Sequence, residues 1–108
     1  MFGLIARMKA QAGKRDALLT ILLEATGDMP GCLSYVVAKD ASDQESLWIT
    51  EVWDSPESHK ASLSLPVVQA AIEKARPLIA GFDNRVTTEP VGGAGLWQPD
   101  RKEVLPAS

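Results

Sequence analysis

Four segments of the chain alternate between apolar and polar positions in the way that β-strands do. Residues 2–10, 32–40 and 82–89 each follow a period of two. Residues 47–53 alternate as well, but both of their sets contain large apolar side chains, which is typical of a strand that is apolar on both faces. The pattern predicts four strands, with the third one buried on two sides.

Two stretches show helical spacing instead. Residues 13–27 repeat leucines at intervals of three and four residues and end at a glycine. A second helix is expected to begin after Ser55, which can accept a hydrogen bond from a free amide of the first turn, with Pro56 at the first helical position. Pro66 interrupts that helix and Pro77 ends or kinks its continuation, so two helical pieces are predicted.

The order β-α-β-β-α-β predicts an α+β fold of the ferredoxin-like, split βαβ type. Its antiparallel sheet has the strand order 4-1-3-2, and both helices cover one face. We expect one domain over residues 1–93 and an extended C-terminal arm over residues 94–108. Because the arm carries Trp97, whose exposure would be unfavourable, we expect this side chain to dock on another subunit.

The fold leaves the other sheet face without helices, and side-chain alternation assigns many apolar residues to it. They are Ile5, Val36, Leu47, Ile49 and Trp53. Such a face is expected to be covered by a second copy, giving a homodimer. The same alternation places Arg7, Glu51 and Arg85 on this interface as an ion-paired ladder; alternatively, they bind an anionic substrate.

Composition excludes several classes of protein. The 108-residue chain has a net charge of −3 and no cluster of Lys and Arg, which argues against nucleic-acid binding. It contains neither an apolar run of about 18 residues nor a signal-peptide pattern, so we expect a cytoplasmic protein without a membrane span. One cysteine and one histidine allow no intrachain disulfide and give no basis for a zinc or di-iron cluster, so no metal is expected.

Four segments of the chain resemble the antibiotic biosynthesis monooxygenase family of dimeric α/β-barrel proteins. They are GLIARMKAQAGKRDAL, DMPGCLSYVVAKD, ITEVWDSPESH and ARPLIAGFDNRV, and the resemblance covers roughly residues 1–93. It implies a cofactor-independent monooxygenase that oxidises an aromatic, quinol-like or polyketide-like molecule with O2. The haem-degrading branch of the family has an axial histidine where this chain has approximately Ile72, so haem is not expected.

His59 is the candidate catalytic base, because an unperturbed imidazole titrates near pH ~6.5 and can accept a phenolic proton. Alternatively, it is a partly exposed helix histidine without a task. Asn84 is the second catalytic candidate, since an amide on an apolar strand face either caps a backbone group or donates to a ligand oxygen. The expected substrate-binding residues, which could also be ordinary core, are Tyr35, Trp48, Thr50 and Ser62.

Two other functions stay open from the sequence. One is a non-oxidative isomerase or cyclase on the same scaffold, which would use His59 as a proton shuttle. The other is a non-catalytic binding or stress-response dimer. No nucleotide-binding motif occurs in the chain, so electrons for an oxidation would have to come from the substrate itself.

Overall fold

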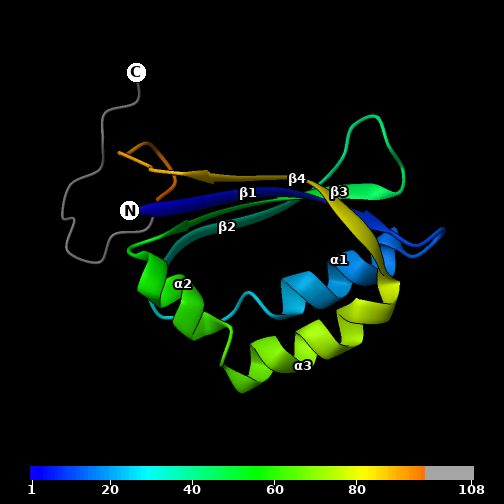
Figure 1. The fold of residues 1–108 in the computed structure, drawn as a ribbon, viewed down its shortest axis with the longest axis horizontal. Helices are drawn as coiled ribbons and strands as arrows, with labels where there is room; N and C mark the ends of the chain where they lie inside the picture. Colours follow the sequence, from blue (N-terminus) through cyan, green and yellow to red (C-terminus); the bar gives the residue numbers. More distant parts are fainter. Residues whose placement is uncertain (97–108) are drawn as a thin grey trace.

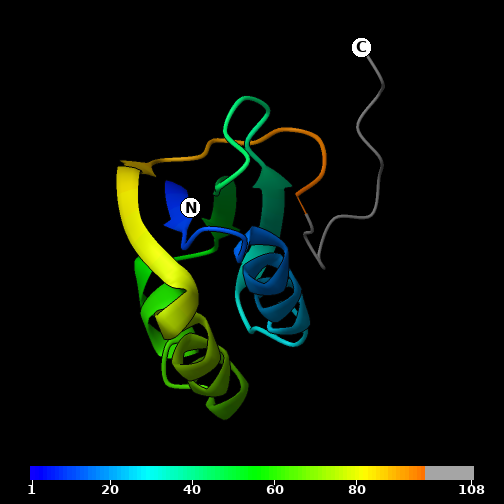
Figure 2. The ribbon, with the colours of Figure 1, turned by 90° about the vertical axis from the view of Figure 1, so that its right-hand side faces the viewer.

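The computed structural model describes residues 1–96, and these form one four-stranded antiparallel sheet with all helices on one of its faces (Figure 1; Figure 2). The elements are β1 (Phe2–Ala10), α1 (Arg15–Glu24), β2 (Cys32–Lys39), β3 (Ser46–Trp53), α2 (Pro56–Ser62), α3 (Pro66–Ala75), the 3-10 helix η1 (Arg76–Leu78) and β4 (Ile79–Thr88). The strand order is β2-β3-β1-β4. The predicted α+β, ferredoxin-like fold is confirmed.

The junction between β3 and α2 forms as the sequence predicts. The Ser55 hydroxyl oxygen accepts a hydrogen bond from the Ser58 amide at 3.1 Å, and Pro56 occupies the first turn. Close by, Gly31 adopts φ +84° and its carbonyl accepts from the Asp54 amide at 2.9 Å. Because α2 leaves directly from the end of β3, its first turns lie beside the last residues of that strand.

Two elements start two or more residues away from the position that the sequence predicts. The first helix begins at Arg15 rather than at Gly13, because Gly13 has φ +75°, which a helix does not accommodate. The last strand begins at Ile79 rather than at Phe82, since Ile79 already pairs with Ala10. Gly81 therefore lies within β4.

The core fills the space between the helices and the face of the sheet that they cover, here called the inner face. Its buried members are Met8, Ala10, Leu18, Leu19, Leu47, Ile49 and Ala75. The opposite, outer face carries a row of side chains that crosses all four strands: Val36, Thr50, Ile5 and Val86 are successive partners in the ladders. Within residues 1–96, no helix has the length and apolar character needed to span a membrane.

The pairing of β1 with β3 corrects the predicted faces of the third strand. Leu4 lies opposite Glu51 and Ala6 opposite Ile49, and residues that face one another across an antiparallel ladder point to the same side. Glu51 and Ile49 are therefore inner-face residues, as are Leu47 and Trp53, whereas Trp48 and Thr50 lie on the outer face. The prediction that put these two sets the other way round was wrong, because the strand is apolar on both sides and its pattern did not decide the direction.

A register shift in β4 reverses the predicted faces there as well. Met8 pairs with Phe82, but its neighbour Arg7 pairs with Asn84, so Asp83 is an extra, unpaired residue. Beyond this bulge the alternation is inverted. Asn84 consequently joins Arg7 on the outer face, and Arg85, opposite Ala6, joins the inner face.

Candidate functional site

A cavity of about 560 Å³ lies between the inner face of the sheet and the helices. Its floor consists of buried residues of β1 and β3, including Leu4, Ala6, Met8, Ile49, Glu51 and Trp53. Its rim consists of exposed residues of the α2–α3 segment and of β4, namely Leu63, Ile72, Arg76, Phe82 and Arg85. A cavity of this volume with mostly apolar walls and a few polar groups is typical of small-molecule sites.

Glu51 is the ionisable residue of the cavity floor. The residue is 8% exposed, and its Oε1 accepts a hydrogen bond from Trp53 Nε1 at 2.9 Å. The same oxygen lies 3.8 Å from His59 Nε2, which reaches it from the second turn of α2. The carboxylate and the imidazole thus meet at the floor, with the indole fixing the orientation of the carboxylate.

His59 is held in place on three sides. Its ring centroid lies 5.3 Å from that of Phe2 and 5.4 Å from that of Trp53, the latter in an edge-on arrangement. Its backbone carbonyl accepts a hydrogen bond from the Ser62 hydroxyl at 2.6 Å. Because the Ser62 hydroxyl donates its proton to this bond, it fixes the helix turn that carries His59. Toward the cavity, the hydroxyl oxygen can only accept a hydrogen bond.

Burial raises the pKa of the Glu51 carboxyl, and the hydrogen bond from Trp53 and the positive charges of His59 and Arg85 offset part of that increase. A carboxylate with a raised pKa is a stronger base than an exposed one. It is also poorly hydrated, so that a proton donor in the cavity becomes its natural partner. Glu51 can therefore remove a proton from a bound ligand, and His59 can relay it.

Tyr35, from β2, presents a phenol to the same cavity. Burial raises the pKa of Tyr35, and the negative charge of the nearby Glu51 carboxylate raises it further. At neutral pH the phenol therefore keeps its proton. It can donate a hydrogen bond to negative charge that develops on a ligand oxygen.

Residues 1–74 match the sequence pattern described as antibiotic biosynthesis monooxygenase. The chain belongs to this family. A family protein from Chloroflexus aurantiacus is 62% identical, with a TM-score of 0.87, over 89% of this chain and 98% of the other. One from Deinococcus radiodurans is 26% identical, with a TM-score of 0.71, over 91% of this chain and 100% of the other.

More distant members of the antibiotic biosynthesis monooxygenase family share the fold. A protein from Caulobacter crescentus is 21% identical, with a TM-score of 0.76, over 84% of this chain and 90% of the other. No curated protein matches the chain.

The structure brings together three of the predicted site residues of this family member and separates the others. His59, Tyr35 and Ser62 all line the cavity. Trp48, Thr50 and Asn84 lie on the outer face instead, so their predicted place at the cavity was wrong. The roles proposed for the first three stay predictions, whereas the other three cannot touch a ligand on the inner side.

The residues expected at the dimer interface also lie on both faces of the sheet, three at the cavity and one on the outer face. Glu51, Trp53 and Arg85 line the cavity, so the predicted ladder with Arg7 is wrong: the residues lie on opposite faces of the sheet. Arg7 does lie on the outer face, where it is ion-paired within the chain. Trp97, the fifth residue expected there, lies outside the described residues.

Glu51 is the functional candidate that sequence reasoning missed as part of the site. The signal was present in the strand: the set that contains Glu51 also contains Leu47, Ile49 and Trp53, which together are more apolar than Trp48, Thr50 and Val52. The more apolar set belongs under the helices. A lone carboxylate within it marks a buried acid that requires a partner or a task.

The described part of the chain offers no evident metal centre, because nowhere in residues 1–96 do three His, Cys, Asp or Glu side chains gather as ligands. The polar groups of the cavity are one carboxylate, one imidazole, one phenol and two guanidinium groups, besides hydroxyls. This set suits proton transfer and the binding of an anion.

Proposed function

We propose that this family member is a cofactor-independent monooxygenase that acts on an electron-rich aromatic molecule, quinol-like or polyketide-like, bound in the cavity. The observation that carries the proposal is the buried Glu51 carboxylate beside His59 on an otherwise apolar floor. Phenols and the activated CH2 groups of partly reduced aromatic ketones become strong reductants when they lose a proton. A buried base is therefore what such chemistry requires from a protein that brings no electrons of its own.

In the proposed reaction Glu51 removes a proton from the activated carbon or hydroxyl, and the resulting anion gives an electron to O2. The two radicals combine to form a carbon-oxygen bond, and the hydroperoxide loses water. For an activated CH2 group the sum is CH2 + O2 → C=O + H2O, so atoms and electrons balance without a cofactor. Tyr35 stabilises the anion, and His59 returns the proton to the leaving hydroxide.

Family membership supports the oxidative reading, since the similar proteins from Chloroflexus aurantiacus and Deinococcus radiodurans carry the monooxygenase name. The oxygen chemistry, the substrate class and the roles of the residues are proposals for this chain. Asn84, given a catalytic role from the sequence, has no part in the proposed reaction because it faces away from the cavity.

The test uses anthrone and a naphthohydroquinone as probes, with oxygen uptake recorded against the spontaneous oxidation of each compound. We expect protein-dependent uptake of one O2 per molecule of anthrone oxidised to the quinone. With 18O2, one labelled atom is expected in the product. A protein that leaves the rate and the labelling at the spontaneous level for every compound of this class would contradict the proposal.

A second candidate function follows from the same carboxylate, because a base that moves protons can isomerise or cyclise a polyketide-like molecule without oxygen. An anaerobic assay separates the two functions: turnover of such a substrate without O2 would favour the isomerase. In a third, non-catalytic function the protein would bind a small molecule in the cavity without transferring a proton. Binding without any turnover, aerobic or anaerobic, would favour it.

We further propose that two copies of the chain pair through the outer faces of their sheets. Val36 and Val86, at the two ends of the row that crosses this face, are 54% and 52% exposed in the single chain. Exposed apolar side chains on a helix-free sheet face are stabilised when a second sheet covers them. The cytoplasmic location, the boundary between residues 93 and 94 and the docking of Trp97 also remain predictions.

A further inference from the structure

Two arginines stand at the rim of the cavity and form no ion-pair contact in the described residues, although the charge of Arg85 acts on Glu51 and Glu73 lines the same hollow as Arg76. Arg76 follows the last residue of α3, and Arg85 comes from β4. Within residues 1–96 neither guanidinium group lies within ion-pair distance of a carboxylate, whereas Arg7 contacts three aspartates and Arg15 contacts one. What distinguishes these two cations is their place, because both line the opening of one cavity, where an anion from outside can reach them.

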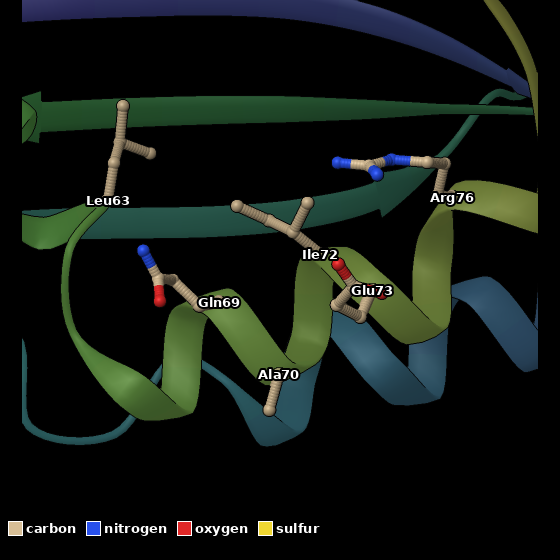
Figure 3. A pocket seen from close by; sticks show the side chains of 6 residues that line it. All are labelled: Leu63, Gln69, Ala70, Ile72, Glu73 and Arg76. Carbon is tan, nitrogen blue, oxygen red and sulfur yellow. The ribbon is translucent and has the colours of Figure 1, made fainter.

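The surroundings of Arg76 show how such an anion would arrive. Leu63, Ile72 and Arg76 line both the cavity and a more open hollow along α3, so they mark the passage between the two. Ile72 of α3 and Arg76, the first residue of η1, extend on the side of the strands, whereas Ala70 points away from them (Figure 3). An apolar ring that enters past Leu63 and Ile72 therefore passes the guanidinium group on its way to the floor.

The charges of the cavity also fix the orientation of a bound molecule. The floor carries Glu51, which repels a second carboxylate, and the rim carries the two arginines. The planar guanidinium group matches a carboxylate with two parallel hydrogen bonds. A molecule with an aromatic body and a carboxylate at one end is thus complementary to the cavity when its acidic end stays at the rim.

We propose that the substrate is an aromatic carboxylic acid of two or three fused rings, whose carboxylate binds Arg76 at the rim with Arg85 as a second cation, and whose reacting end lies at Glu51 and His59. The inference rests on the proposed function, because it takes the cavity as the substrate site. The volume of about 560 Å³ lies within the range of small-molecule pockets and leaves room for two or three fused rings. The carboxylate takes no part in the oxidation and serves to orient the ring.

The test measures binding rather than turnover. The probes are 6-hydroxy-2-naphthoate, which carries its hydroxyl and carboxylate at opposite ends, and the methyl ester of the same acid. Both are titrated calorimetrically into the full chain. We expect the acid to bind about tenfold more tightly than the ester at low ionic strength, and the difference to shrink as salt is added.

Variants identify the residue that carries the preference. Arg76→Gln should reduce the preference for the acid over the ester from about tenfold to about twofold. Arg76→Lys should keep part of the preference, since lysine keeps the positive charge but cannot form the two parallel hydrogen bonds of a guanidinium group. Lys74→Gln is the matched control: it removes one positive charge from the same helix, away from the cavity, and should leave the ratio unchanged. The ester affinity of each variant shows that the cavity itself is intact.

An acid and an ester of equal affinity would overturn the inference, as would a ratio that Arg76→Gln leaves intact or a failure of both compounds to bind. Because binding needs no oxygen, these outcomes are separate from those of the oxygen assay. Oxygen uptake without a preference for the acid would overturn this inference alone. An Arg76-dependent preference in a protein that consumes no oxygen would overturn the monooxygenase and leave the aromatic-acid site standing.

Discussion

The two faces of the sheet shift the pKa of a carboxyl group in opposite directions. On the inner face, burial raises the pKa of Glu51, and Trp53 donates the one side-chain hydrogen bond that this carboxylate accepts within residues 1–96. On the outer side, hydrogen bonds lower the pKa of Asp40: it accepts from two backbone amides at 2.8 and 2.9 Å, from Trp48 Nε1 at 2.7 Å and from Arg7 Nε at 3.1 Å.

This difference indicates that Asp40 has a structural role and that Glu51 is suited to act as a base. Asp40 has its ionised form fully hydrogen-bonded, so it ties the hairpin after β2 to the outer face and has little tendency to take up a proton. Glu51 lies where burial favours its neutral form, so its carboxylate gains from accepting a proton. Substitutions on the inner and on the outer face test this difference separately.

The largest effect is expected from Glu51→Gln. The amide oxygen can still accept from Trp53, but it cannot take a proton, so turnover of an accepted substrate should fall by about a thousandfold while the melting temperature is kept or raised. Oxygen uptake and thermal unfolding measure the two quantities. Glu57→Gln, an exposed carboxylate in the first turn of α2, is the control. A Glu51→Gln protein with more than a third of the normal rate would remove Glu51 from the reaction.

His59→Ala should have the next largest effect on activity. Loss of the imidazole removes the relay beside Glu51 and opens space next to Phe2, so we expect the rate to fall by about a hundredfold. Steady-state oxygen uptake at several pH values measures it, with the neighbouring exposed Lys60→Ala as control. An unchanged rate would show that His59 serves only to pack against the two aromatic rings.

The fold was predictable because its signals are local and agree with one another. The alternation of residues 2–10, the leucine spacing of the first helix and the Ser55-Pro56 cap each specify an element on their own, and their order specifies the sheet. The places of His59 and Tyr35 were predictable for the same reason. The cap sets the helix turn of the histidine, and β2 alternates regularly from Ser34 to Lys39, beyond a register shift between Cys32 and Ser34.

The rest of the site depended on information that is not local. In β3 both faces carry a tryptophan, so the strand's own composition marks the inner set only weakly, and the pairing with β1 decides that Trp53 lies inside and Trp48 outside. In β4 the extra residue Asp83 inverts the alternation, and nothing in the sequence marks it as a bulge. The face of β3 and the bulge in β4 were both assigned wrongly from the sequence. As a result, Glu51 was left out of the predicted site and Asn84 was included in it.

On the outer face, Val86→Asp should weaken the proposed dimer by at least about tenfold, because each copy would bring a charge into an apolar contact. Sedimentation velocity over a range of concentrations measures the change. Val67→Asp is a matched control, since Val67 is similarly exposed but lies on α3, away from this face. A normal protein that sediments as a monomer at micromolar concentration would contradict the dimer itself.

Arg7→Met tests whether the outer cluster is structural. Arg7 contacts Asp40, Asp43 and Asp83 at 3.1, 3.2 and 2.7 Å, so its loss leaves three carboxylates without their shared cation. We expect the melting temperature to fall by roughly 5 °C, with the rate per folded molecule preserved. Lys9→Met is the comparison, because Lys9 contacts Asp43 alone, at 3.8 Å, and should cost less. Equal stability of the Arg7 variant and the normal protein would count against a structural cluster.

The smallest effects are expected in the pH dependence of stability, where the two carboxylates should act in opposite directions. The pKa of Asp40 is lowered by folding, so its contribution is present above the unfolded value of about 3.9 and is lost as the pH falls below it. The pKa of Glu51 is raised by folding. Its contribution is therefore present below the unfolded value of about 4.3 and is lost as the pH rises through the folded pKa.

Urea midpoints between pH 3 and pH 8, at fixed protein concentration and ionic strength, separate the two contributions. Asp40→Asn should flatten the acid limb below about pH 4, and Glu51→Gln should flatten the decline above about pH 4.3. If Glu51→Gln instead followed the normal curve throughout, the carboxylate would carry no burial penalty in the folded protein. The inner and outer faces would then not differ in the way that makes Glu51 a base, because the free energy that raises its pKa is the same free energy that its ionisation takes from the fold.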